Sequence, residues 1–265
     1  MKRKQKAFTL AEVLMVLGVL GVIAMMTLPT LSADVRGTQL AATLRTTQAS
    51  ISDKLDAAMA LEDVNDIRDL QAFSATTKAE LYNGLSKYLR LDKIGSDHVI
   101  RPISGSTETT WEAADIKQTN TGAYIYISDF SELRSDKLEE INASHGALLR
   151  RNAIVFIDVN AEKKPNRLGY DVFQYYLAQD GRLYPVGGRD VSLFLSGNPT
   201  ASDWTASGET SCSKENGDGY GCAGRVEDEE WKMKYISTKG KVKVSQSGGE
   251  ETDTPDETPE TTPET

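Results

Sequence analysis

The sequence predicts an α+β fold in which one long N-terminal helix packs on a small antiparallel sheet. Two observations predict this class. An apolar run from Val13 to Leu28 is followed by a helical stripe of apolar residues, whereas from residue 123 onward the apolar residues alternate with a period of two. The chain has 265 residues, enough for one domain beside the helix.

The first helix begins in an apolar segment with the length of a membrane span. Basic residues at positions 2, 3, 4 and 6 precede it, and from Phe8 to Leu28 it offers about the twenty residues that cross hydrocarbon. A secretory signal peptide would have a shorter apolar region and a small-residue cleavage site, whereas Pro29 and Thr30 follow here. The basic flank places the N-terminus in the cytoplasm and the rest of the chain outside the cytoplasmic membrane.

One carboxylate, Glu12, lies near the start of this apolar segment. A charge at membrane depth costs about 2.5–3.5 kcal/mol on insertion scales, so Glu12 indicates a function and needs a partner. A plain membrane anchor would explain the length and the basic flank. It would not explain Glu12 or the abrupt junction between Ala7 and Phe8.

The order of basic leader, small residue, Phe8, carboxylate and apolar helix resembles the N-terminus of type IV pilins and of the pseudopilins of type II secretion systems. The resemblance implies that a prepilin peptidase cleaves between Ala7 and Phe8 and methylates the new amino group of Phe8. The family usually has Gly where this chain has Ala7. Glu12 then matches the family's assembly carboxylate, and its expected partner is the Phe8 amine of a neighbouring subunit.

The same resemblance implies a structural function. The protein would be a pilin-like subunit that packs helix to helix into a type II secretion pseudopilus or a type IV pilus. Its partners would be other pilin-like subunits, prepilin peptidase, the inner-membrane assembly platform and, before assembly, the lipid bilayer. It would be a single-pass protein of the cytoplasmic membrane with an exported head, and then part of a periplasmic or extracellular filament. The alternative is a membrane-tethered exported binding domain that does not polymerise.

Pro29 falls where many pilins carry a helix-breaking proline. Proline removes a helical hydrogen bond and bends the helix, so the helix either ends at Pro29 or continues beyond it with a kink. Continuation is favoured because helical periodicity resumes downstream. The apolar positions of this stripe are Val35, Leu40, Leu44, Ile51, Leu55 and Met59.

The chain is therefore expected to divide into five parts. These are a cleaved basic leader at 1–7, a transmembrane and assembly helix at 8–31, its amphipathic continuation at 32–61, a globular head at 62–244 and a disordered acidic tail at 245–265. From Glu250 onward the tail has only Thr, Pro, Glu and Asp, so it cannot form a core. It is expected to be a solvated spacer or an O-glycosylated segment.

Within the head, a second helical pattern covers residues 66–91, with Gly84 as an unfavourable residue inside it. Residues 95–121 contain few apolar residues and predict a loop with at most short strands. Strands are predicted at 123–128, 153–159, 171–177, 183–186 and 231–235, with a hairpin turn at 179–182. Trp231 in the last of these is expected to be a core residue.

The loop from residue 158 to 171 contains several oxygen-bearing side chains. Asp158, Asn160, Glu162 and Asp171 could surround calcium, although the spacing is not that of an EF-hand. Some major pseudopilins bind calcium near their sheet. The favoured interpretation is a loop between two strands in which Asp171 bonds the loop backbone. Apart from this possible calcium, no cofactor is expected.

The two cysteines, Cys212 and Cys222, are separated by nine residues. Outside the cytoplasm such a pair is expected to be oxidised, and type IV pilins often have a disulfide-bounded loop near the C-terminal end. A zinc site would need four ligands, and neither histidine, His98 or His145, lies near the cysteines in sequence.

The sequence contains no recognisable catalytic motif, so an enzyme is not predicted. The net charge is −9, and seven acidic residues lie from Glu250 onward. The acidity of the tail argues against DNA as a partner through this segment, and no nucleic acid is indicated as a partner.

Overall fold

The computed structural model describes residues 10–104, 107–128, 151–188, 204, 211–213, 218–233 and 235, with the backbone alone at 26–34 and 151–152. The predicted cleavage site at Ala7 and Phe8, His145 and the predicted tail lie outside these residues.

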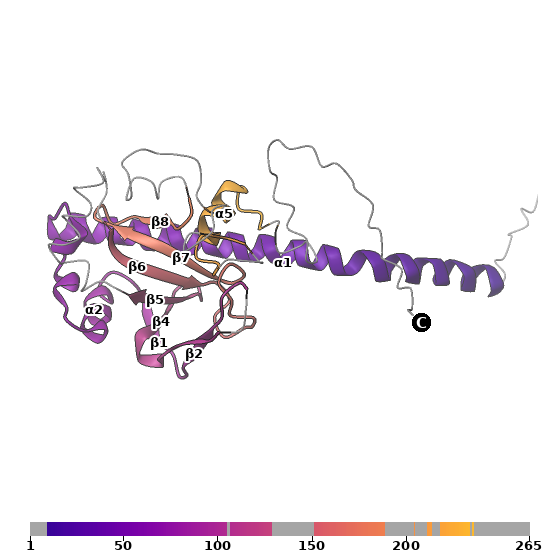
Figure 1. The fold of residues 1–265 in the computed structure, drawn as a ribbon, viewed down its shortest axis with the longest axis horizontal. Coiled ribbons are helices and arrows are strands. Elements are labelled where there is room, and N and C mark those ends of the chain that lie inside the picture. Colours follow the sequence, from indigo (N-terminus) through magenta and orange to yellow (C-terminus); the bar gives the residue numbers. More distant parts are fainter. Residues whose placement is uncertain are drawn as a thin grey trace, which may run out of the picture.

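Helix α1 (Leu10–Glu62) is continuous, and its backbone remains helical through Pro29. Figure 1 shows its C-terminal half lying along the sheet and its N-terminal half projecting beyond the head. The predicted apolar stripe packs into the head from Leu40 to Met59. Val35 is the exception and is half exposed.

The projecting half of α1 exposes apolar side chains around the helix, with 81% of Leu10 and 52% of Ile23 accessible. Its described side chains end at Met25 and resume at Val35. Across the side chains that are described, we find no helical stretch with the length and hydropathy of a membrane span.

A six-stranded antiparallel sheet lies across α1, which confirms the predicted α+β class (Figure 1). Its strands, in spatial order, are β1 (Leu91–Lys93), β4 (Ile116–Thr119), β5 (Tyr124–Ser128), β6 (Arg151–Asp158), β7 (Val172–Ala178) and β8 (Leu183–Pro185). The last four correspond to predicted strands, which alternation identifies at 123–128 and a fuller apolar run at 153–159.

The two faces of the sheet contact different partners. One face packs against α1 in a continuous core, with Ile125, Val155 and Phe173 as examples. The opposite face carries Tyr124 and Phe156 and is partly covered by a two-stranded hairpin. The hairpin strands are β2 (His98–Ile100) and β3 (Thr109–Trp111). The head is therefore layered as helix, sheet and hairpin.

The prediction of one helix over residues 66–91 is wrong for most of its length. The segment forms two 3-10 turns and one α-helix, which are η1 (Ile67–Asp69), η2 (Gln71–Ser74) and α2 (Lys78–Leu85). Buried Leu70 and Phe73 are three residues apart, a spacing that suits 3-10 turns as well as α-helix. A further 3-10 turn, η3 (Ala113–Asp115), precedes β4.

The prediction of a last strand at 231–235 is also wrong. Trp231 and Met233 have φ angles of 61° and 42°, so the backbone leaves the extended region at both residues. Trp231 is partly buried against the core. A short helix that was not predicted, α5 (Cys222–Asp228), packs on β7 and β8 instead.

Candidate functional site

The first candidate site is the projecting part of α1. Glu12 lies in the first described turn of the helix, next to Val13, Leu14 and Met15, which are all largely exposed. The structure thus places the predicted assembly carboxylate on a segment that the head does not cover. Its proposed partner, the Phe8 amine, lies outside the described residues.

The second candidate site is the loop that connects β6 to β7. Asp158 is fully buried at the end of β6. Its Oδ1 accepts hydrogen bonds from the backbone N–H groups of Asn160 and Ala161, both at 3.1 Å. Its Oδ2 lies 2.6 Å from Nε2 of His98 on the hairpin. The pairing with His98 was not predicted, because 60 residues separate the two in sequence.

Asp171 is the second fully buried carboxyl group of this loop. Its Oδ1 accepts a hydrogen bond from the N–H of Arg167 at 2.6 Å. Its Oδ2 accepts from the N–H of Asn166 at 3.0 Å and from Nδ2 of Asn160 at 3.1 Å. Asp171 therefore bonds the loop backbone in the way that the favoured sequence interpretation describes.

Burial dominates the electrostatics of both carboxyl groups. Loss of hydration raises the pKa of Asp158, while its hydrogen bond with His98 acts in the opposite direction. Loss of hydration and the nearby charge of Asp158 raise the pKa of Asp171 to about 6. Each group is thus biased toward its neutral form by its surroundings.

The fit of this loop to calcium is mixed. Among the described residues, no three His, Cys, Asp or Glu side chains are grouped as metal ligands. The carboxylate oxygens of Asp158 and Asp171 already accept hydrogen bonds. However, the side-chain oxygens of Asn160 and Asn166 are buried and have no hydrogen-bond partner. Glu162 accepts a hydrogen bond from the hydroxyl of Tyr124 at 3.3 Å.

A disulfide joins Cys212 to Cys222, the first residue of α5. Arg225 on α5 donates to the carbonyl oxygen of Cys212 at 3.3 Å and pairs with Glu229 at 2.9 Å. The guanidinium carbon of Arg225 lies 4.5 Å from the ring centre of Tyr235. The disulfide and Arg225 thus hold the C-terminal part of the head together.

Comparison with known proteins concerns the N-terminal segment. Residues 2–28 match the family model of the prokaryotic N-terminal methylation motif. Searches of the curated proteins and of the solved structures found no match. The matched residues include Ala7, Phe8 and Glu12 and lie before the head. The chain therefore carries the prepilin-type cleavage and methylation segment of type IV pilins and pseudopilins.

Proposed function

We propose that the protein is a structural pilin-like subunit that prepilin peptidase cleaves between Ala7 and Phe8 and methylates at Phe8. The mature subunit assembles through α1 into a type II secretion pseudopilus or a type IV pilus. The methylation motif at residues 2–28 carries this proposal and indicates a structural subunit rather than an enzyme. The head, which comes after α1 in the chain, is an exported domain of the α+β class.

The surface of α1 supports this proposal. Large apolar side chains from Leu10 to Met25 are exposed on the projecting helix, and a helix that is apolar all round is stable only when something covers it. The bilayer covers it in the precursor, with the basic leader in the cytoplasm. Helices of neighbouring subunits cover it after assembly.

Glu12 gives the assembly its register. A carboxylate in an apolar helix bundle is costly unless an opposite charge lies close to it. The methylated amine of Phe8 in the neighbouring subunit supplies that charge only when the two helices are aligned correctly. A misplaced subunit leaves both charges without a partner, so the pair selects one axial position.

Contacts at the junction of α1 with the head fix the position of the head relative to the helix. Arg36 donates a hydrogen bond to the carbonyl oxygen of Lys164 at 3.0 Å. A Cβ at Gly37 would lie 3.6 Å from Cβ of Met233, so the helix contacts the C-terminal segment here. Beyond this point Leu44 and Leu55 are buried in the core. These contacts join the helix to the head.

The test of assembly uses Glu12→Leu and Glu12→Ala, with Glu12→Asp as the matched control that keeps the charge. The full chain is expressed in cells with an active assembly machine, and purified filaments and membranes are probed for it. We expect the two neutral variants to remain in the membrane and to be lost from filaments, whereas Glu12→Asp retains part of the incorporation. Normal incorporation of Glu12→Leu would refute the role of Glu12 in assembly, and absence of the natural chain from the filaments would refute the filament proposal.

The test of processing is the mass of the mature N-terminus. We expect the chain to begin with N-methylated Phe8. Ala7→Gly should be processed at least as fast as the natural sequence, because it restores the residue that is usual in the family. A leader that stays attached in cells with active peptidase would contradict the proposal.

The alternative function is a membrane-tethered exported binding domain that does not polymerise. It shares the anchor and the export of the head, but it has no use for Glu12. The two functions therefore differ in the Glu12→Leu experiment. A tether predicts the same membrane retention and the same absence from filaments for the natural chain and for the variant.

Calcium binding by the β6–β7 loop is a second proposal, which the buried and unpartnered oxygens of Asn160 and Asn166 favour. The donor set would be completed by carboxylate oxygens of Asp158 and Asp171. If calcium binds, millimolar calcium should raise the Tm of the chain above its value in EDTA, and Asn160→Ala should abolish the increase. An unchanged Tm in calcium would refute this proposal.

A further inference from the structure

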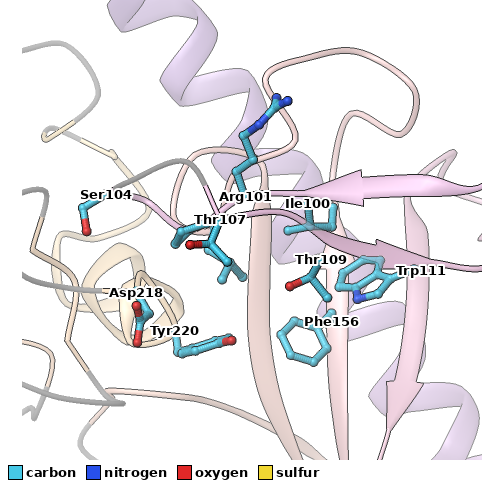
Figure 2. Close-up of a pocket in the computed structure, with 11 residues that line it drawn as sticks. Ile100, Arg101, Ser104, Thr107, Thr109, Trp111, Phe156, Asp218 and Tyr220 are labelled. Atoms are coloured by element: carbon cyan, nitrogen blue, oxygen red, sulfur yellow. The ribbon is translucent and has the colours of Figure 1, made fainter.

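A cavity of about 330 Å³ lies between the β2–β3 hairpin, the exposed face of β6 and the segment that leads into α5. Figure 2 shows this pocket, with Thr107 and Thr109 from the hairpin facing Phe156 and Tyr220. Its volume falls at the lower end of the range of small-ligand sites, about 300–1,000 Å³.

The apolar part of the lining consists of aromatic rings. Trp111 is 5% exposed and stacks on Tyr126, with ring centres 4.7 Å apart and an angle of 2° between the ring planes. Phe156 lies beside Trp111 at 5.3 Å, and Tyr220 meets Phe156 edge to face at 6.2 Å. Of these packed rings, Trp111, Phe156 and Tyr220 line the cavity.

The polar part of the lining carries hydroxyl groups and one carboxylate. The hydroxyls belong to Ser104, Thr107, Thr109 and Tyr220, and the carboxylate belongs to Asp218. A hydroxyl group both donates and accepts hydrogen bonds, whereas a carboxylate accepts several. The pocket therefore combines aromatic rings with a polar rim, formed by these hydroxyls and Asp218, that suits a ligand rich in hydroxyl groups.

The charges of the lining argue against an anionic ligand. Arg101 forms an ion pair with Glu108, and Figure 2 shows its guanidinium pointing away from the other lining side chains. Asp218 would repel an anion. An entirely apolar ligand is also disfavoured, because it would remove water from the hydroxyls and from Asp218 without replacing their hydrogen bonds.

The pocket is held in shape by backbone contacts. The N–H of Ile103 donates to the carbonyl oxygen of Asp218 at 3.0 Å. Gly219 has φ of +93°, and a Cβ there would lie 2.9 Å from both Ile103 Cβ and the carbonyl oxygen of Leu168. Only glycine allows so close an approach. Because residues 218–220 lie between the two cysteines, the disulfide also restrains the segment that supplies Asp218 and Tyr220.

We propose that this pocket binds one unit of a neutral saccharide. The apolar C–H face of the sugar ring lies against Phe156 and Tyr220. Its hydroxyl groups exchange hydrogen bonds with the threonine hydroxyls and the Asp218 carboxylate. The pocket lies on the head, away from the projecting helix, so binding does not depend on whether the protein forms filaments.

The experiment uses the full chain in micelles of a detergent without a sugar headgroup. The probes are glucose, galactose, mannose, N-acetylglucosamine, N-acetylgalactosamine and their β-1,4-linked disaccharides. Saturation-transfer NMR detects contact, and tryptophan fluorescence gives the affinity. We expect saturable binding of at least one probe with Kd in the range of about 1–10 mM, as suits a ligand of this size.

Two substitutions on different elements locate the binding. Thr109→Val removes a rim hydroxyl at nearly constant shape, and Asp218→Asn removes the charge of the carboxylate. Each should weaken binding about fivefold or more, as the loss of one hydrogen bond predicts. Thr110→Val is the matched control, because Thr110 is the adjacent residue of β3 and alternation places it on the opposite face. Its Kd should stay within about twofold of the natural chain.

Each outcome supports or overturns the proposal. The Tm of each variant shows whether it is folded, and Asp218→Asn tests the pocket even if Thr109→Val destabilises the hairpin. Saturable binding that both lining variants weaken and Thr110→Val does not supports the saccharide site. The absence of saturable binding to the whole probe set at 50 mM, or equal effects of Thr109→Val and Thr110→Val, overturns it.

Discussion

Nε2 of His98 lies 2.6 Å from Oδ2 of Asp158, and this contact joins the β2–β3 hairpin to the end of the central strand β6. Both residues are buried, with 5% and 0% of their surface exposed. Trp111 of the hairpin lies in the same contact region, because the centre of the Trp111 ring is 6.2 Å from that of the His98 ring. The hairpin is thus fixed on the sheet by one buried polar pair and by ring packing.

His98→Phe and Asp158→Leu should each destabilise the head by about 3 kcal/mol, because each leaves a buried polar partner without its hydrogen bond. The double variant should lose less than the sum of the two. Urea unfolding of both single variants and the double variant measures the coupling free energy. Additive losses would show that the pair contributes no interaction of its own.

The pKa of Asp171 predicts a pH dependence of stability. In the folded chain Asp171 keeps its proton up to about pH 6, whereas an unfolded Asp releases it near pH 4. The folded state therefore binds more protons between these values, so its stability should fall as the pH rises from about 4 to about 6. A shift of about two units corresponds to at most about 3 kcal/mol.

Asp171→Asn should make the slope of Tm against pH in this window smaller, because asparagine keeps an oxygen acceptor and does not titrate. Some slope should remain, since the pKa of Asp158 is raised as well. The measurement is thermal unfolding in EDTA. Asp53→Asn, at an exposed position of α1, is the control and should keep the slope of the natural chain. Equal slopes for all three proteins would contradict the prediction.

The disulfide should stabilise the folded head. It closes a loop with a sequence separation of 10, which the chain-entropy account values at somewhat under ~3 kcal/mol. The double variant Cys212→Ser/Cys222→Ser should therefore have a lower Tm than the natural chain. A reducing agent should lower the Tm of the natural chain and leave that of the variant unchanged. A Tm that is equal in the variant and the oxidised chain would refute this.

In Gly84→Ala, a gain in helix propensity is opposed by a loss in packing. Alanine is favoured over glycine by about 1 kcal/mol in a helix, but a Cβ at Gly84 would lie 2.7 Å from Cα and 2.8 Å from Cβ of Ala72. We expect packing to prevail, so the variant should be destabilised by about 1–3 kcal/mol.

Gly37→Ala is the matched control. It also lies in a helix, but its Cβ would meet Met233 at an ordinary contact distance of 3.6 Å. It should raise the stability by about 0.5–1 kcal/mol, as propensity alone predicts. Thermal unfolding of the two variants shows whether each substitution raises or lowers the stability. Stabilisation by Gly84→Ala would show that Ala72 moves away from the added Cβ at no cost in free energy.

Periodic patterns made the largest elements predictable. The apolar stripe along α1 and the alternation in β5 arise because each element packs one face into the core. The fuller apolar runs of β6 and β7 belong to strands whose two faces both pack against other parts of the head. The same reasoning failed at residues 66–91, where an apolar spacing of three suits two kinds of helix. It also failed at Trp231, because nothing in the local sequence indicates the positive φ angle of that residue.

The sequence alone determined the N-terminal methylation motif, because this motif depends on the order of residues along the chain, Ala7, Phe8 and Glu12 among them. The tertiary structure decided the pairing of His98 with Asp158, the close approach of Ala72 to Gly84 and the pocket formed by Thr109, Phe156 and Tyr220. The physical reason is distance along the chain. A motif read by a peptidase or by a neighbouring helix is local, whereas a buried pair or a pocket exists only after the sheet has brought distant segments together.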